Sequence, residues 1–200
     1  MNQRTIAVVT AGLTTPSSTR LLADRLSAAV RDQLDGRGTA YKVEVIELRD
    51  LAHDLTNNLL TGFPSPELGK VLETVVAADG LIAVTPTFSA SYNGLFKMFF
   101  DVLDDQALAG KPVLIAATGG TERHSLVLDF ALRPLFSYLK AIVMPTGVYA
   151  ASSDWGAGAT KLHARIERAA AELVDAMSNE RQPAADPYAN PTPFEDLLNS

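Results

Sequence analysis

The chain has 200 residues, which suits one domain with a sizeable hydrophobic core or a domain with an added tail. Its net charge of −6 and lack of a basic block argue against nucleic acid as a partner, and the absence of cysteine excludes disulfides, thiolate metal sites and a cysteine nucleophile. No apolar run approaches the about 20 residues that a membrane helix needs. The first residues, 1–5, lead straight into the first expected strand, so we expect a strand there rather than a signal peptide. We therefore expect a cytoplasmic protein without a membrane segment.

Short apolar runs alternate with amphipathic segments along the chain, which is the pattern of a parallel sheet covered by helices on both faces. Strands are expected at residues 5–9, 41–47, 80–85, 111–118 and 141–149. Helices are expected around residues 21–34, 66–78, 92–108, 125–139 and 159–178. The connection at 48–66 is expected to be mixed and loop-like, with room for short helical turns. Prolines dominate the end of the chain, so we divide it into a domain at 1–180 and a tail at 181–200.

A glycine and a cluster of hydroxyls separate the first expected strand from the first helix. Such a loop offers free backbone N–H groups, hydroxyl donors and the positive end of a helix dipole, which together suit a phosphate monoester. It contains neither the Gly-x-Gly-x-x-Gly of a dinucleotide fold nor the Gly-Lys-Ser/Thr of a P-loop. The alternative is that a hydroxyl only caps the helix. The candidate phosphate-binding residues are Gly12, Leu13, Ser17, Ser18 and Thr19.

Hydroxyl-rich loops of this kind belong to the flavodoxin-like fold, a three-layer α/β sandwich. We expect a five-stranded parallel sheet of order 2-1-3-4-5 with helices on both faces. In that order the loops after the first, third and fourth strands meet at one crevice. These three loops are therefore where a ligand is expected to bind.

The second of these loops carries a recognisable pattern: a Thr-Pro step, an aromatic residue, a polar turn, a glycine and a Leu-x-Lys helix that ends in Asp. The matching residues are Thr85, Pro86, Phe88, Gly94, Leu95, Lys97 and Asp101. Over roughly residues 5–150 the chain resembles the NADPH-dependent FMN reductase family of flavodoxin-like NAD(P)H:flavin oxidoreductases. It departs from the family at Phe88, usually tyrosine, and at Thr14, usually arginine, for which Arg20 is the nearest replacement.

The resemblance implies that FMN binds across the three loops, with its phosphate on the first. The residues expected beside the flavin ring are Pro86, Thr87, Phe88 and Ser89 in the second loop and Thr118, Gly119, Gly120 and Thr121 in the third. Two consecutive glycines expose backbone N–H groups and let a flat ring approach. The competing interpretation is a pair of structural loops, the third being a tight turn without a ligand.

Several neighbouring residues have more ordinary explanations. Lys97 and Asp101 stand four apart and suit a helix-surface ion pair, and Arg133 is expected to be structural. Arg123 and His124 lie near the expected opening of the ligand crevice. There His124 either hydrogen-bonds the flavin or a nicotinamide phosphate, or is a solvated surface histidine. No residue is assigned to acid–base catalysis, and no spacing of histidines and carboxylates suits a metal.

The resemblance implies an NAD(P)H-dependent FMN reductase that transfers hydride from the nicotinamide to flavin N5 and supplies reduced FMN to a partner flavin-dependent monooxygenase. It also implies a homodimer or homotetramer, with the apolar stretch 96–100 and the tail as candidate interfaces. The alternatives are an FMN-containing quinone or azo-compound reductase and an electron-transfer flavodoxin. A response-regulator-like module would need paired aspartates where this chain has Ala11 and Gly12.

Overall fold

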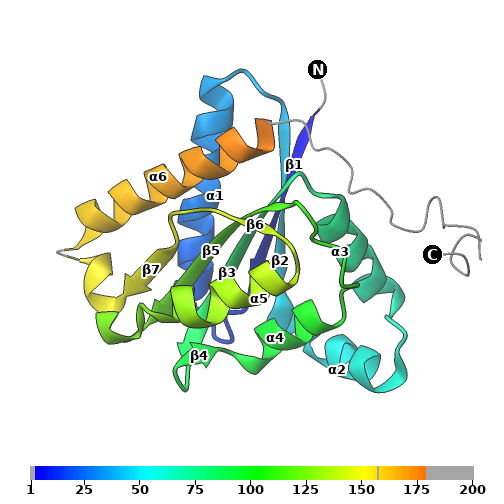
Figure 1. The fold of residues 1–200 in the computed structure, drawn as a ribbon. Helices are drawn as coiled ribbons and strands as arrows, with labels where there is room; N and C mark the ends of the chain where they lie inside the picture. Colours follow the sequence, from blue (N-terminus) through cyan, green and yellow to red (C-terminus); the bar gives the residue numbers. More distant parts are fainter. Residues whose placement is uncertain (1–2, 157, 179–200) are drawn as a thin grey trace, which may run out of the picture.

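The computed structural model describes residues 3–156 and 158–178. Its strands pair into one central sheet (Figure 1). The main path runs β2-β1-β3-β5-β6 with all its strands parallel, which is the order 2-1-3-4-5 once the short β4 and β7 are set aside. The expected α/β class is confirmed, but the sheet has seven strands rather than five. The strands are β1 (Arg4–Thr10), β2 (Tyr41–Glu47), β3 (Gly80–Phe88), β4 (Ser91–Tyr92), β5 (Pro112–Gly119), β6 (Ile142–Val143) and β7 (Val148–Ala151).

The expected fifth strand is divided into β6 and β7, which both pair with β5. Pro145 causes the break because it has no N–H group to donate to the ladder. The N–H of Thr146 donates instead to the Glu172 carboxylate at 2.8 Å, and parallel pairing resumes at Val148. The strand expected at 141–149 is therefore two strands, β6 and β7, in the structure.

The other additional strand, β4, comes from the loop that follows β3. Phe88 pairs with Ser91 across a two-residue turn, so this segment is a hairpin rather than the open loop expected. The turn residues Ser89 and Ala90 have φ of 47° and 66°, the left-handed values that a type I′ hairpin requires. Left-handed backbone is uncommon in residues other than glycine, so the rest of the fold must hold this turn in place.

Helices cover both faces of the sheet (Figure 1). The helices are α1 (Ser18–Gly36), α2 (Ala52–Thr61), α3 (Pro66–Ala77), α4 (Gly94–Asp101), α5 (Arg133–Tyr138) and α6 (Ala159–Ser178). Short 3-10 turns form η1 (Leu48–Leu51), η2 (Glu122–His124) and η4 (Ser152–Trp155), and a π-helical turn forms η3 (Leu128–Leu132). Alternate strand residues serve the two faces: Ile6 and Val8 pack under α1 and α6, whereas Ala7 and Val9 face the other helices.

Three helical predictions needed correction. The connection 48–66 contains η1 and the ten-residue helix α2. The helix expected at 92–108 ends at Asp101, before a turn in which Asp104 Oδ1 accepts from the N–H of Gln106 at 2.9 Å. The helix expected at 125–139 begins as the π-helical turn η3 and becomes α-helical only at α5, because Pro134 has no N–H for an α-helical bond.

An aromatic cluster fills the core beneath α4 and α5. Phe96, Phe99 and Phe100 are at most 2% exposed, and the Phe100 ring lies 4.9 Å from that of Phe136 in a T-shaped contact. These rings are therefore part of the core of the chain. Lys97 and Met98 of the same stretch are only partly buried, and the expectation that the stretch 96–100 contributes to an interface stays a prediction.

The expected boundary at residue 180 and the proline-rich tail 181–200 lie outside the described residues. The division of the chain at that point therefore stays a prediction. Within residues 3–156 and 158–178, no helix is both long and apolar enough to cross a membrane.

Candidate functional site

Three segments meet at the carboxyl-terminal edge of the sheet. They are the first loop (residues 11–17), the hairpin (residues 87–92) and the glycine loop (residues 118–121), which follow or end β1, β3 and β5. The start of α1 and the hairpin strand β4 lie at the same end of the sheet in Figure 1. Ligands of open α/β sheets bind at this edge.

The first loop is closed onto the start of α1. The Ala11 N–H donates to the Val84 carbonyl at 2.9 Å, which keeps the loop in line with β3. A Cβ on Gly12 would collide with Ser17 Oγ and lie 3.1 Å from Ser17 Cβ, so glycine lets the loop pack against the Ser17 cap without moving it. Ser17 Oγ accepts from the Arg20 N–H at 3.2 Å as the N-cap of α1. Ser17 therefore does cap α1, but its own hydroxyl hydrogen has no acceptor within the described residues, so a cap and a phosphate contact are compatible.

Free hydrogen-bond donors gather along this loop. Within residues 3–156 and 158–178, no protein group accepts from the N–H groups of residues 12–15. Ser18 and Thr19 occupy the first turn of α1, where backbone N–H groups lack intrahelical acceptors. The Thr10 hydroxyl at the end of β1 is buried and has no partner in the described part of the chain. Neutral donors at a helix N-terminus fit an anion such as a phosphate monoester.

A buried hydrogen bond joins the first helix to the glycine loop. Thr19 Oγ1 lies 2.9 Å from Thr118 Oγ1, and both residues are almost completely buried. Two candidate site residues far apart in the sequence are thus brought together. Leu13 and Ser18 lie beside them on the outside and are exposed.

The glycine loop is fitted against Tyr149 of β7. A Cβ on Gly119 would collide with Tyr149 Oη and lie 3.2 Å from Cζ, whereas a Cβ on Gly120 would meet nothing within 4 Å. Tyr149 Oη donates to the Thr121 carbonyl at 2.9 Å, and this bond fixes the end of the glycine loop against β7. Burial raises the pKa of the Tyr149 phenol, and the nearby Thr87 hydroxyl partly lowers it. Tyr149 was not among the predicted site residues.

Asn93 ties the hairpin to the first loop. Its Nδ2 donates to the Ala11 carbonyl at 2.8 Å, while its Oδ1 accepts from the Phe96 N–H at 2.8 Å as the N-cap of α4. Its backbone N–H donates to Thr85 Oγ1 at 3.2 Å. The helix expected at 92–108 starts two residues before α4, so the expectation did not identify this asparagine as a cap. An asparagine directly before Gly94 and an amphipathic run is the N-cap signal that could have found it.

The remaining candidates of the second loop follow the strand. Pro86, Thr87 and Phe88 are the last residues of β3, and Ser89 opens the hairpin turn. Phe88 is 49% exposed at the outer end of the strand. Pro86 pairs with Thr118 across the sheet, so the hairpin and the glycine loop leave the sheet side by side.

Arginines flank the first loop, and carboxylates neutralise them. Arg20 Nε lies 2.8 Å from Asp24 Oδ1, and Arg20 Nη1 contacts Glu47 Oε1. The hydrogen bond with Asp24 raises the pKa of Arg20, against the lowering effect of burial, and Glu47 raises it further. Arg49 Nη2 lies 2.9 Å from Glu47 Oε2, and Arg49 was not singled out from the sequence. Arg20 is therefore near the loop, as expected of a replacement cation, but it is already paired.

The other residues considered in the sequence either make structural contacts or are exposed near the glycine loop. Arg133 donates to the carbonyls of Met144 and Pro145 at 3.2 Å, so its structural role is confirmed. Lys97 and Asp101 form the expected surface ion pair. Arg123 and His124 are exposed on η2, and their side chains have no hydrogen-bond or ion-pair partner in the described part of the chain.

No group of three or more His, Asp or Glu residues within 3–156 and 158–178 is arranged to hold a metal ion. The site therefore consists of neutral donors, glycines and one aromatic edge. It offers binding and orientation rather than acid–base chemistry.

A doubly wound α/β sheet with a donor-rich loop at its carboxyl edge defines a class of mononucleotide-binding proteins. The model of the family described as NADPH-dependent FMN reductase matches residues 4–156. The chain belongs to this family and is an oxidoreductase, as the sequence predicted.

Relatives and solved structures agree with that membership. The chain is 43% identical over 150 residues to an FMN reductase (NADPH) of Pseudomonas aeruginosa, covering 75% of this chain and 78% of the relative. It is 37% identical over 172 residues to the NADH-dependent FMN reductase SfnE of Pseudomonas putida, covering 84% and 90%. An oxidoreductase from Corynebacterium diphtheriae is 50% identical with a TM-score of 0.88, covering 90% of this chain and all of that one. A flavodoxin, WrbA-like protein from Agrobacterium tumefaciens, 16% identical with a TM-score of 0.61, shares the fold and confirms the flavodoxin-like prediction; it covers 90% of this chain and all of that one.

Proposed function

We propose that this NAD(P)H-dependent FMN reductase binds FMN across the first loop, the hairpin and the glycine loop, and passes reduced FMN to a separate flavin-dependent monooxygenase. The observation that carries the proposal is the row of N–H groups at residues 12–15 and at the start of α1 that have no acceptor within the described residues. They lie at the edge of the sheet where the hairpin and the glycine loop also leave it. When bound, FMN supplies the hydride acceptor for the reduced nicotinamide.

The chain's own residues bind and orient the flavin in this proposal. The backbone N–H groups of the first loop and the Ser17 hydroxyl hold the phosphate. Gly120 leaves open space beside the ring, and the N–H groups of the glycine loop face its polar edge. Phe88 supplies an exposed aromatic edge at the outer end of the hairpin. No side chain is required to donate or remove a proton.

Charge balance around the first loop favours FMN as an exchanging substrate rather than a prosthetic group. Arg20 and Arg49 are paired with Asp24, Glu47 and Asp50, so two positive charges meet three negative charges beside the loop. The phosphate then gains hydrogen bonds from neutral donors and little net Coulomb attraction. Reversible binding is what delivery of reduced FMN to another enzyme needs.

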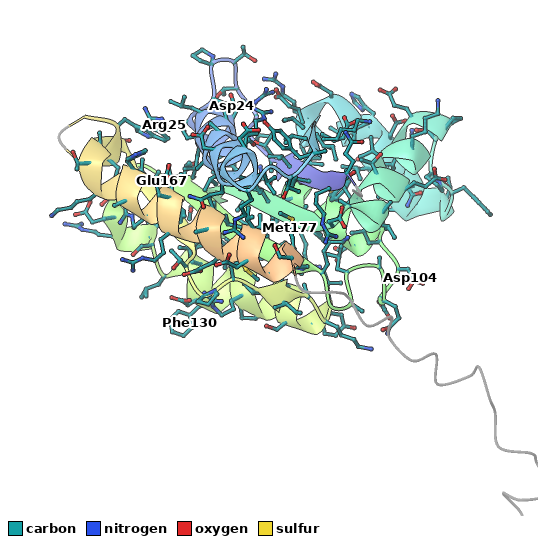
Figure 2. All side chains as sticks on the ribbon, turned by 90° about the horizontal axis from the view of Figure 1, so that it is seen from above. Asp24, Arg25, Asp104, Phe130, Glu167 and Met177 are labelled. Atoms are coloured by element: carbon teal, nitrogen blue, oxygen red, sulfur yellow. The ribbon has the colours of Figure 1, made fainter. Side chains whose placement is uncertain are left out.

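We further propose that the protein works in the cytoplasm as a homodimer or homotetramer. Leu126 and Phe130, close to the glycine loop along the chain, are 60% and 77% exposed, and Figure 2 shows Phe130 at the outer rim of the molecule. Large exposed apolar side chains beside a site mark an association surface. Light scattering coupled to gel filtration tests this: a single species of one chain mass would overturn it.

The function is tested by recording the visible spectrum of the purified protein and following NADH and NADPH oxidation with and without added FMN. Oxidation that depends on added FMN is the expected result. A yellow protein that reduces quinones without added flavin would replace this proposal with a prosthetic-group quinone reductase. A protein that neither binds flavin nor oxidises a nicotinamide would contradict both.

A further inference from the structure

Arg49 is the residue that reaches the middle of the first loop from another element. It lies on η1, directly after β2, and its Nη1 donates to the Thr14 carbonyl at 3.1 Å and to Thr15 Oγ1. Thr14 Oγ1 makes only a local bond, to the Pro16 carbonyl at 3.0 Å. Within the described residues, Arg49 supplies every hydrogen bond that residues 12–16 receive from outside the loop.

The Arg49 guanidinium is itself held in place. Its Nη2 lies 2.9 Å from Glu47 Oε2, and the other oxygen of the same carboxylate binds Arg20 of α1. The Arg49 side chain is 28% exposed and that of Glu47 is 17% exposed, so both lie partly beneath the surface. A planar guanidinium can hold the carboxylate with one nitrogen and the loop with another, which an ammonium group does much less well.

The bond to the Thr14 carbonyl also orients the next N–H group. The Thr14 carbonyl and the Thr15 N–H belong to one planar trans peptide, so they point in opposite directions. When Arg49 holds the oxygen, it therefore turns the Thr15 N–H away from itself, toward the other side of the loop. That N–H has no acceptor in the described part of the chain.

We propose that Arg49 is a positioning residue for phosphate recognition: it fixes the first loop from behind, so that the loop's N–H groups face the FMN phosphate. The inference rests on the proposed function, because it presumes that the first loop binds this phosphate. Arg49 acts through the peptide it holds, since its charge is already paired with Glu47. The loop therefore requires the planar guanidinium with its several N–H donors, rather than a positive charge alone.

The test compares FMN with riboflavin, which has the same ring and no phosphate. Flavin fluorescence quenching gives Kd for both ligands in the wild type, Arg49→Gln and Arg49→Lys. We expect both variants to weaken FMN binding about tenfold, the effect of losing a charged hydrogen bond, and to change riboflavin binding less than twofold. Arg133→Gln is the matched control, because the Arg133 guanidinium also holds backbone in place, through the carbonyls of Met144 and Pro145, but away from the first loop. Its ratio of the two Kd values should stay at the wild-type value.

A milder variant guards against a folding defect. Thr15→Val removes one acceptor of Arg49 and leaves the Thr14 carbonyl in place, so we expect a smaller loss of FMN affinity in the same direction. An Arg49→Lys protein with the wild-type FMN preference would overturn the inference, because charge alone would then suffice. Equal losses for FMN and riboflavin, or no loss, would overturn it too. If the wild type binds neither flavin, the proposed function itself fails, and the two failures are distinguishable.

Discussion

The first loop and the glycine loop lie at the same edge of the sheet but are held by different forces. The glycine loop ends a strand whose residues 112–118 are all buried, and it is fitted sterically against Tyr149. The first loop depends on hydrogen bonds from partly exposed side chains such as Arg49. Changes at the glycine loop should therefore lower stability first, whereas changes at the first loop should alter flavin affinity with smaller effects on stability.

The largest effect is expected at the glycine loop. Gly119→Ala puts a Cβ into Tyr149 Oη, and such overpacking should lower the free energy of unfolding by about 3 kcal/mol. Urea unfolding measures it, with Gly120→Ala as the control because its Cβ would meet open space. Adding Tyr149→Phe to Gly119→Ala should restore part of the loss. A Gly119→Ala protein as stable as the wild type would show that the loop is not held sterically.

Asn93 joins the two regions, and its loss should have the next largest effect. Asn93→Ala removes the N-cap of α4 and the bond to the Ala11 carbonyl, together worth about 2 kcal/mol. Asn93→Ser keeps a capping hydroxyl but is too short to hold Ala11, so about half of the loss is expected. Thermal unfolding of the two variants separates the contributions, and equal losses would mean that only one of them matters.

At the first loop the expected effect on stability is smaller and the effect on binding is selective. Ser17→Ala removes the N-cap of α1, which lowers stability by about 1 kcal/mol. It should also weaken FMN binding while leaving riboflavin binding unchanged, as fluorescence titration would show. Ser18→Ala is the control for stability, because the Ser18 hydroxyl makes no hydrogen bond within the described residues. If riboflavin binding fell equally, the contrast between the two loops would be wrong.

The smallest effect concerns pH. Burial raises the pKa of Tyr149 in the folded state above the value of about 10 for an unfolded tyrosine. Its contribution to stability is therefore present below about pH 10 and is lost as the pH rises toward the folded pKa. Urea unfolding between about pH 8 and 11 should show a steeper decline for the wild type than for Tyr149→Phe. Exposed Tyr138 provides the control, and Tyr138→Phe should follow the wild type.

Local patterns predicted the sheet well. The run at residues 41–47 is a strand with those bounds, and Pro66 opens α3 behind the Ser65 cap, because these signals depend on neighbouring residues alone. The break at Pro145 was also a local signal, but the apolar residues on both sides of it favoured one long strand.

The site was less predictable than the fold. Ser17 and Gly119 stand in loops whose composition indicated a ligand. Arg49 reaches the site from η1, directly after β2, and Tyr149 reaches it from β7. Their contacts depend on the register and packing of strands far away in the sequence. No local pattern distinguishes a tyrosine that closes a glycine loop from one that fills a core.

The divided outer strand also bears on whether copies of this protein can associate through the edges of their sheets. An uninterrupted edge strand offers a row of unpaired N–H and C=O groups on which a strand from another molecule can add. Here the edge beyond β5 is interrupted at Pro145, and the opposite edge strand, β2, carries the charged pair Lys42 and Glu44. Neither border of the sheet is a long, flat, apolar template for strand addition, and on one side Pro145, which divides the predicted fifth strand, is the cause.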